Sequence, residues 1–168
     1  MLGLGLWLVG FVLFINGMWL LGKMDNKAVI PMNIFVAIIQ LAGVLRTIFT
    51  ANAQADYYGA ALTLLFTFTY GYVAATQIWN LDGRGVGWYC LPVSLIAIPA
   101  GIQSIQAGGQ TGLAVLWFMW ATLWFMYWLL LALGKSSIAK ATAWWTVINA
   151  VVTFAGAYLT STGYMPWW

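Results

Sequence analysis

The sequence predicts an all-α integral membrane protein with six transmembrane helices, and three observations lead to this prediction. Of its 168 residues, 64% are hydrophobic and only 5% are charged, whereas soluble domains carry roughly 25% charged residues. The apolar residues fall into six segments, each close to the about 20 residues that an α-helix needs to cross a bilayer. The basic residues gather in alternate connections between these segments. We expect residues 1–168 to form a single transmembrane domain.

Short polar stretches separate the six apolar segments. The expected spans cover approximately residues 2–21, 28–49, 58–79, 87–105, 112–133 and 141–159. Pro92 and Pro99 lie inside the fourth span and predict a kink there. After the last span, Tyr164, Trp167 and Trp168 are expected to anchor the chain at the membrane interface.

The placement of basic residues predicts the orientation of the bundle. Five of the six lie in the first, third and fifth connections: Lys23, Lys27, Arg84, Lys135 and Lys140. Basic loops face the cytoplasm in multi-pass membrane proteins. We therefore expect both termini to lie outside the cytoplasm.

The three odd-numbered spans end alike, which indicates an internal repeat. Their ends read Leu21-Gly22-Lys23, Asp82-Gly83-Arg84 and Leu133-Gly134-Lys135. A glycine followed by a cation suits the C-terminus of a helix. This pattern favours a two-helix hairpin used three times, although any span that runs inward and ends in Gly-Lys would look the same.

The chemistry-bearing residues exclude most enzyme classes. The chain has no histidine and three carboxylates, Asp25, Asp56 and Asp82, and its one cysteine is Cys90. Nucleophile triads, paired-carboxylate catalysis and metal sites cannot be assembled from these residues. No charge lies well inside a span, which argues against proton- or cation-coupled transport. We expect no catalysis, no cofactor, no metal and no nucleic-acid partner.

A column of tryptophans is the most unusual feature of the fifth span. At 100° per residue, Trp117, Trp120, Trp124 and Trp128 fall within one helical arc of about 80°. Membrane tryptophans usually collect at the interface, but Trp120 and Trp124 lie near the middle of this span. They either pack between helices or form the wall of a narrow passage.

Other spans present faces that could complete such a passage. On the first span they are Leu6, Val9, Leu13, Asn16 and Gly17, and on the third Phe66, Tyr70, Val73 and Gln77, with Thr63 beside them. Asn149 adds an amide near the middle of the sixth span. A slot of this kind rejects ions, which would lose their hydration. It accepts flat neutral solutes such as urea and short-chain amides, which stack on rings. Asn16 and Asn149 could equally be interhelical hydrogen-bond partners.

Several motifs in these faces resemble the AmiS/UreI family of urea and short-chain amide channels. The motifs are Met1-Leu-Gly-Leu, Val9-Gly10 with Leu13 and Asn16-Gly17, Leu64-Leu-Phe-Thr-Phe-Thr-Tyr70 with Leu81-Asp82, and Trp117-x-x-Trp120-x-x-Leu123-Trp124. The resemblance covers essentially the whole chain. It implies a two-helix hairpin repeated three times around a central pore. It also implies a homohexamer with one pore per protomer and lipid in the middle of the ring.

The resemblance also implies site residues. The positions that match residues lining or supporting the family's pore are Val9, Leu13, Phe66, Tyr70, Trp117, Trp120, Leu123 and Trp124, and Asn16 matches an asparagine at the same place. Asn149 stands where the acid-gated members carry a glutamate, and it completes the set of candidate solute-contacting residues.

The chain departs from the acid-gated members in its connection before the third span. Those members carry a long outer loop rich in histidine. Here the corresponding connection, residues 50–56, is short and contains no histidine. A histidine switch is therefore impossible, and we expect conduction to be independent of pH between 5 and 7.5. The predicted function is passive passage of urea across the bacterial inner membrane, with a cytoplasmic urease or amidase consuming the solute. A channel for acetamide-like solutes and a structural membrane protein without solute flux are the alternatives.

Overall fold

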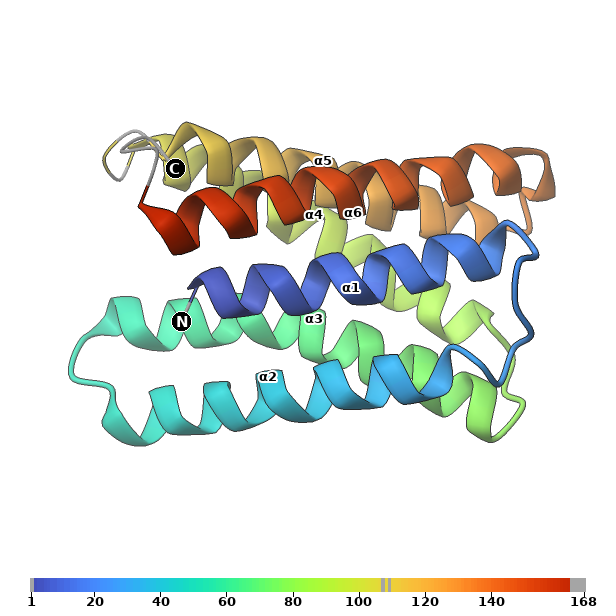
Figure 1. Cartoon of the computed structure of the whole chain (residues 1–168), viewed down its shortest axis with the longest axis horizontal. Coiled ribbons are helices and arrows are strands. Elements are labelled where there is room, and N and C mark those ends of the chain that lie inside the picture. Colours follow the sequence, from blue (N-terminus) through green and yellow to red (C-terminus); the bar gives the residue numbers. More distant parts are fainter. Residues whose placement is uncertain (1, 107, 109, 164–168) are drawn as a thin grey trace.

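A computed structural model describes residues 2–106, 108 and 110–163 of the chain, and all regular elements in this part are helical. The main helices are α1 (Leu2–Leu20), α2 (Ile30–Thr50), α3 (Gln54–Ile78), α4 (Arg84–Gln106), α5 (Thr111–Tyr127) and α6 (Ala139–Thr162). They run along the long axis of the molecule, and the start of α1 and the end of α6 lie at the same end (Figure 1). Six helical segments of the described chain are long and apolar enough to cross a membrane. The predicted fold class is confirmed.

Helix α3 begins several residues earlier than the sequence predicts, because a carboxylate organises its first turn. Oδ2 of Asp56 accepts hydrogen bonds from the backbone N–H groups of Asn52 and Ala53 at 3.0 and 3.1 Å. A carboxylate in this position satisfies amides that a helix start leaves unpaired, and it interacts favourably with the helix dipole. The connection between α2 and α3 is thereby reduced to residues 51–53. The aromatic anchor expected at Tyr164, Trp167 and Trp168 lies outside the described residues.

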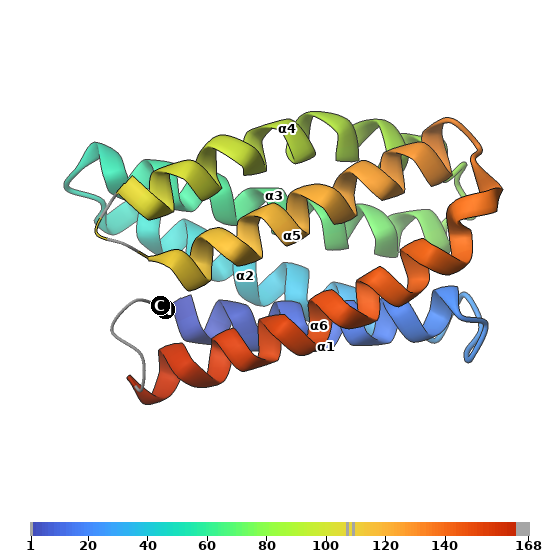
Figure 2. The same ribbon diagram turned by 90° about the horizontal axis from the view of Figure 1, so that it is seen from above.

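The six helices pack mainly as three pairs: α1 with α6, α2 with α3, and α4 with α5. Figure 2 shows α1 and α6 side by side at one edge of the bundle and α4 at the opposite edge, with α5 between α4 and α6. The helices joined by the basic connections, such as α1 and α2, pack against each other less extensively. The threefold hairpin repeat stays a prediction, and the closest packing lies between successive hairpins rather than within them.

Glycines let the helices of two pairs approach closely. A Cβ atom on Gly17 of α1 would lie 2.6 Å from Cγ2 of Val147 on α6. A Cβ atom on Gly87 of α4 would lie 2.4 Å from the backbone nitrogen of Ala132, just beyond α5. Small residues drive helix association in membranes because they let backbones come together. These two glycines therefore set the spacing of α1 against α6 and of α4 against the end of α5.

The ends of the odd-numbered helices follow the predicted pattern in two cases and depart from it in the third. Gly22 and Gly134 have the left-handed backbone conformation, with φ of 72° and 64°. At the end of α3 the left-handed residue is Asn80, with φ of 50°, and not Gly83. Asparagine also tolerates this conformation. The sequence-based expectation for Gly83 is wrong, because the helix ends earlier and Gly83 lies directly before α4.

The end of the fifth span next to its basic connection has wider helical turns than an ordinary α-helix. Helix α5 continues from Trp128 to Ala132 as a π-helix, a form that is rare and common at functional sites. Helix α4 runs through Pro92 and Pro99 without a break and is visibly curved (Figure 2). The prolines thus bend this span without interrupting it.

Candidate functional site

Two cavities enter the bundle from opposite ends. The first, of about 440 Å³, is bordered by the start of α1, the end of α4 and the start of α5, and we name it the terminal-end cavity. The second, of about 300 Å³, reaches the other end of the bundle, where the basic connections lie, and we name it the basic-end cavity. No charged side chain is found among the described residues that line either cavity. The molecule therefore has an uncharged recess on each side.

The two cavities meet at a group of aromatic rings in the middle of the bundle. Among the described residues, only Phe66 and Trp120 line both cavities. Phe66 is the central residue of the 25-residue helix α3. Its ring centroid lies 4.8 Å from that of Trp120, 4.8 Å from that of Trp124 and 5.7 Å from that of Trp117. We name these four residues the aromatic barrier.

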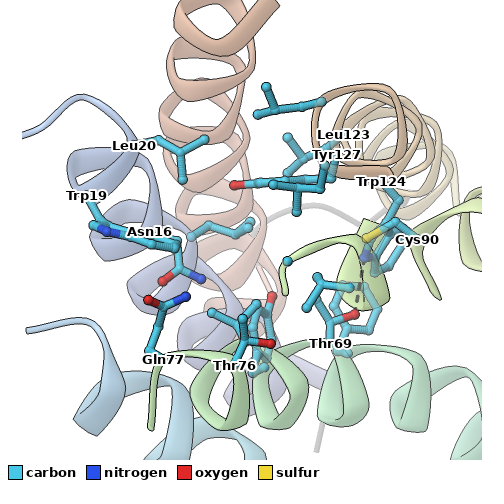
Figure 3. A pocket seen from close by; sticks show the side chains of 18 of the residues that line it. Asn16, Trp19, Leu20, Thr69, Thr76, Gln77, Cys90, Leu123, Trp124 and Tyr127 are labelled. Atoms are coloured by element: carbon cyan, nitrogen blue, oxygen red, sulfur yellow. Dashed lines mark hydrogen bonds between the residues drawn. The ribbon is translucent and has the colours of Figure 1, made fainter. Parts of the chain in front are cut away.

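Threonines on neighbouring helices hold two indoles of the barrier in place. Nε1 of Trp120 donates to Oγ1 of Thr153 on α6 at 3.2 Å. Nε1 of Trp124 donates to Oγ1 of Thr69 on α3, also at 3.2 Å (Figure 3). A buried indole N–H needs such a partner. Because the N–H groups are used in this way, the rings present mainly their apolar surface to the cavities.

The basic-end cavity carries neutral hydrogen-bonding groups below the barrier. Tyr70 is buried and lines this cavity, and its hydroxyl has no hydrogen-bond partner in the described part of the chain. Near the mouth, the side chains of Asn16 and Gln77 point toward one another, with Thr76 beside them (Figure 3). The buried Oγ1 atom of Thr76 has no partner. The wall of this cavity therefore contains the hydroxyls of Tyr70 and Thr76, which have no hydrogen-bond partner in the described part of the chain.

Asn16 also forms an interhelical bond, so both interpretations of this residue apply. Its Nδ2 donates to Oδ1 of Asn33 on α2 at 3.1 Å, and Nδ2 of Asn33 donates back to Oδ1 of Asn16 at 2.7 Å. Asn33 is fully buried and also donates to the carbonyl of Val29. This reciprocal pair of amides joins α1 to α2 and fixes the orientation of Asn16 at the cavity wall.

The structure brings nine of the ten candidate site residues to the walls of the two cavities. Val9 and Trp117 line the terminal-end cavity, Phe66 and Trp120 line both, and the basic-end cavity is lined by Leu13, Asn16, Tyr70, Leu123 and Trp124. Asn149 is the exception. It is fully buried, it lines neither cavity, and its Nδ2 donates to the carbonyl of Trp145 at 2.8 Å.

Several residues of the site were not found from the sequence. Thr69 and Thr153 orient the indoles, Asn33 pairs with Asn16, and Gln40 lines the terminal-end cavity. Thr69 lies within the Phe-Thr-Tyr motif, which was a usable signal. Asn33 and Gln40 lie seven residues apart, and polar residues on one face of an apolar helix indicate an inward face.

The basic connection between α3 and α4 contains an exposed ion pair that lies outside the cavities. The side chain of Arg84 bonds to the carboxylate of Asp82, and the backbone N–H of Arg84 donates to Oδ1 of Asp82 at 2.9 Å. Hydrogen bonds from Arg84 hold the pKa of the Asp82 carboxyl below its ordinary value of 3.8. No group of three or more metal-ligating side chains occurs among the described residues.

These features define a class of protein: a six-helix membrane protein with an uncharged recess on each side and an aromatic barrier between them, which is the architecture of a channel for neutral solutes. A sequence model of AmiS/UreI family transporters matches residues 1–161. The chain belongs to the AmiS/UreI family, a family of channels and transporters and not of enzymes.

Relatives of this chain include a protein named for amidate substrates and a protein named as a urea channel. A protein of Mycolicibacterium smegmatis named as an amidate substrates transporter protein is 36% identical over 91% of this chain and 72% of its own length. The acid-activated urea channel of Helicobacter pylori strain J99 is 30% identical over 91% of this chain and 93% of its own length. The cryo-electron microscopy structure of the H. pylori urea channel in a closed state superposes with a TM-score of 0.89 at 30% identity, and the match covers 98% of this chain and all of that one.

Proposed function

We propose that this protein is a passive channel for urea. The single observation that supports this most is the meeting of two uncharged cavities at the barrier ring of Phe66. An ion would lose its hydration at this point without compensation. Urea is flat and neutral, so it can stack on the ring faces while its N–H and carbonyl groups bond to neutral groups such as the free hydroxyl of Tyr70. All ten candidate residues, Asn149 included, are proposed to line or support this path.

The second candidate solute is a short-chain aliphatic amide such as acetamide. An amide shares the flat carbonyl and N–H pattern of urea, and the M. smegmatis relative is named for amidate substrates. Stopped-flow uptake of urea, acetamide and propionamide by proteoliposomes separates the two. Uptake of urea faster than that of both amides supports the urea channel, and preference for acetamide supports the alternative. Uptake no faster than in empty liposomes contradicts both and indicates a structural membrane protein.

The proposed orientation follows from charge. The basic connections face the cytoplasm by the positive-inside rule, so the basic-end cavity opens inward and the terminal-end cavity opens outward. Both termini then lie outside the cytoplasm of a bacterial inner membrane. The single domain of residues 1–168 is proposed to assemble as a homohexamer with lipid in the ring. A cytoplasmic urease or amidase would maintain the inward gradient.

We further propose that conduction does not depend on pH between 5 and 7.5. The chain contains no histidine. The connection between α2 and α3 is short, and the Asp56 carboxylate beside it is bonded to backbone amides. Histidine is the side chain whose ordinary pKa lies near neutrality, and its absence removes the usual switch of an acid-gated channel.

A further inference from the structure

The middle of helix α2 carries a buried polar side chain that the path described so far does not use. Gln40 is the central residue of the 21-residue helix α2 and is only 6% exposed. Ten residues of helix, or about 15 Å, separate it from either end of α2. It therefore lies near the middle of this membrane-spanning helix.

The hydrogen-bonding capacity of Gln40 is not used by the protein. Its Oε1 atom is buried without a partner, and its side chain makes no hydrogen bond in the described part of the chain. An amide removed from water without a partner costs free energy. Asn33, about two helical turns earlier on the same face of α2, avoids this cost by its reciprocal bonds to Asn16. Gln40 has no such partner.

The side chain of Gln40 borders the terminal-end cavity together with the barrier residues Phe66, Trp117 and Trp120. The hydroxyls of Thr63 and Ser104 line the same cavity, but each donates to a carbonyl of its own helix, at 3.0 and 2.9 Å. Gln103 also lines this cavity and is exposed. Gln40 is thus a buried group with free hydrogen-bonding capacity in the wall of the cavity that ends at the barrier.

We propose that Gln40 is a solute-binding and specificity-determining residue, which hydrogen-bonds the ureido or carboxamide group of the solute before it enters the barrier. This inference rests on the proposed function. Rotation of the carboxamide exchanges Oε1 and Nε2, so a solute with both a carbonyl and an N–H can bond to either. The Asn16–Asn33 pair shows that two primary amides bond to one another in this protein. On the other side of the barrier, the hydroxyl of Tyr70 receives the solute. The aromatic barrier then has a hydrogen-bonding group on each side.

The test is urea uptake by proteoliposomes containing the full-length wild type, Gln40→Met, Gln40→Asn or Gln54→Met, measured over a range of urea concentrations. Methionine keeps the length of the side chain and removes the amide. We expect Gln40→Met to raise the half-saturating urea concentration several-fold. Gln40→Asn, which keeps the amide, should recover part of the wild-type behaviour. Gln54→Met should leave uptake unchanged, because Gln54 is exposed at the start of α3 and is not among the residues that line either cavity.

Wild-type half-saturation and flux in both Gln40 variants would overturn the inference while leaving the proposed function standing. If Gln40→Met does not assemble, Gln40→Asn is the deciding variant. Asparagine withdraws the amide by one methylene and should still raise the half-saturating urea concentration. An unchanged half-saturating concentration contradicts the inference. Loss of maximal flux at unchanged half-saturation also contradicts it, because that result marks a structural role. Absence of wild-type uptake above empty liposomes would instead be a failure of the proposed function.

Discussion

The ring of Phe66 on α3 meets the indole of Trp120 on α5 edge to face, with their centroids 4.8 Å apart and their planes at 80°. These two residues border both cavities. A solute that passes from one recess to the other inside the bundle therefore passes these rings. The neighbouring indoles of Trp117 and Trp124 extend the aromatic surface on either side.

Removal of the hydroxyl of Thr69 should loosen the barrier. In Thr69→Val the indole of Trp124 loses its acceptor, and a net hydrogen bond corresponds to about 1 kcal/mol, or roughly a fivefold effect. We expect urea permeability of proteoliposomes to change by up to this factor and discrimination against propionamide to weaken. The hydroxyl of Thr69 also donates to the carbonyl of Leu65 on its own helix at 2.6 Å. Thr122→Val is the matched control, because Thr122 is exposed and its hydroxyl likewise donates to a carbonyl of its own helix, but it accepts no hydrogen bond from an indole in the described part of the chain. Equal behaviour of the two variants would show that the indole does not depend on Thr69.

The amide pair of Asn16 and Asn33 should stabilise the bundle. Each single change to leucine leaves the remaining buried amide without its partner amide, at a cost of about 1–2 kcal/mol. The double variant should be less destabilised than the sum of the single variants, because no amide is then left without its partner. Thermal unfolding in detergent, followed by circular dichroism, measures this. Strictly additive effects would argue against a coupled pair.

The spacing of α4 against the end of α5 should not tolerate a methyl group at Gly87. In Gly87→Ala the new Cβ would lie 2.4 Å from the backbone nitrogen of Ala132, so the helices must move apart. We expect a lower thermal midpoint and reduced flux, since Leu130 and Leu131 of the π-helix line the basic-end cavity. Gly71→Ala is the control, because its Cβ would meet Ala37 at an ordinary 3.9 Å. An unchanged midpoint in Gly87→Ala would contradict the close contact.

The six spans and the fold class were predictable because hydropathy and length alone determine which segments can cross a bilayer. The inward faces of α1 and α3 were also predictable, since Leu13 and Asn16, or Phe66 and Tyr70, follow the helical period. The partners across helices were not. Thr69 meets Trp124, and Thr153 meets Trp120, only because the helices adopt a particular rotation and axial register, which one sequence does not specify.

Local hydrogen bonding explains the errors in the helix ends. The carboxylate of Asp56 extends α3 at its start, and Asn80 takes the left-handed position that the sequence suggested for Gly83. The π-helix at Trp128–Ala132 has no signal in the apolar sequence.

Asn149 was expected in the passage from its depth in the sixth span. Depth does not determine the direction in which a side chain points, and the side chain of Asn149 lines neither cavity.

Urea uptake should be equal at external pH 5 and pH 7.5. Hydrogen bonds from Arg84 lower the pKa of Asp82 from 3.8, so the stabilisation that this carboxylate contributes is present above 3.8 and is lost only as pH falls through the lowered value. That loss lies below the tested window. Stopped-flow uptake at the two external pH values checks the prediction. A several-fold rise in uptake at pH 5 would contradict it.

The most direct measurement of the central claim is the urea permeability of proteoliposomes that contain Phe66→Trp, compared with Phe68→Trp. An indole in place of the Phe66 ring adds volume where the two cavities meet, whereas Phe68 lies on the same helix and is 52% exposed on its outer face. The account predicts that Phe66→Trp reduces urea uptake to the level of empty liposomes while Phe68→Trp conducts like the wild type. Wild-type uptake in an assembled Phe66→Trp protein would contradict passage between Phe66 and Trp120.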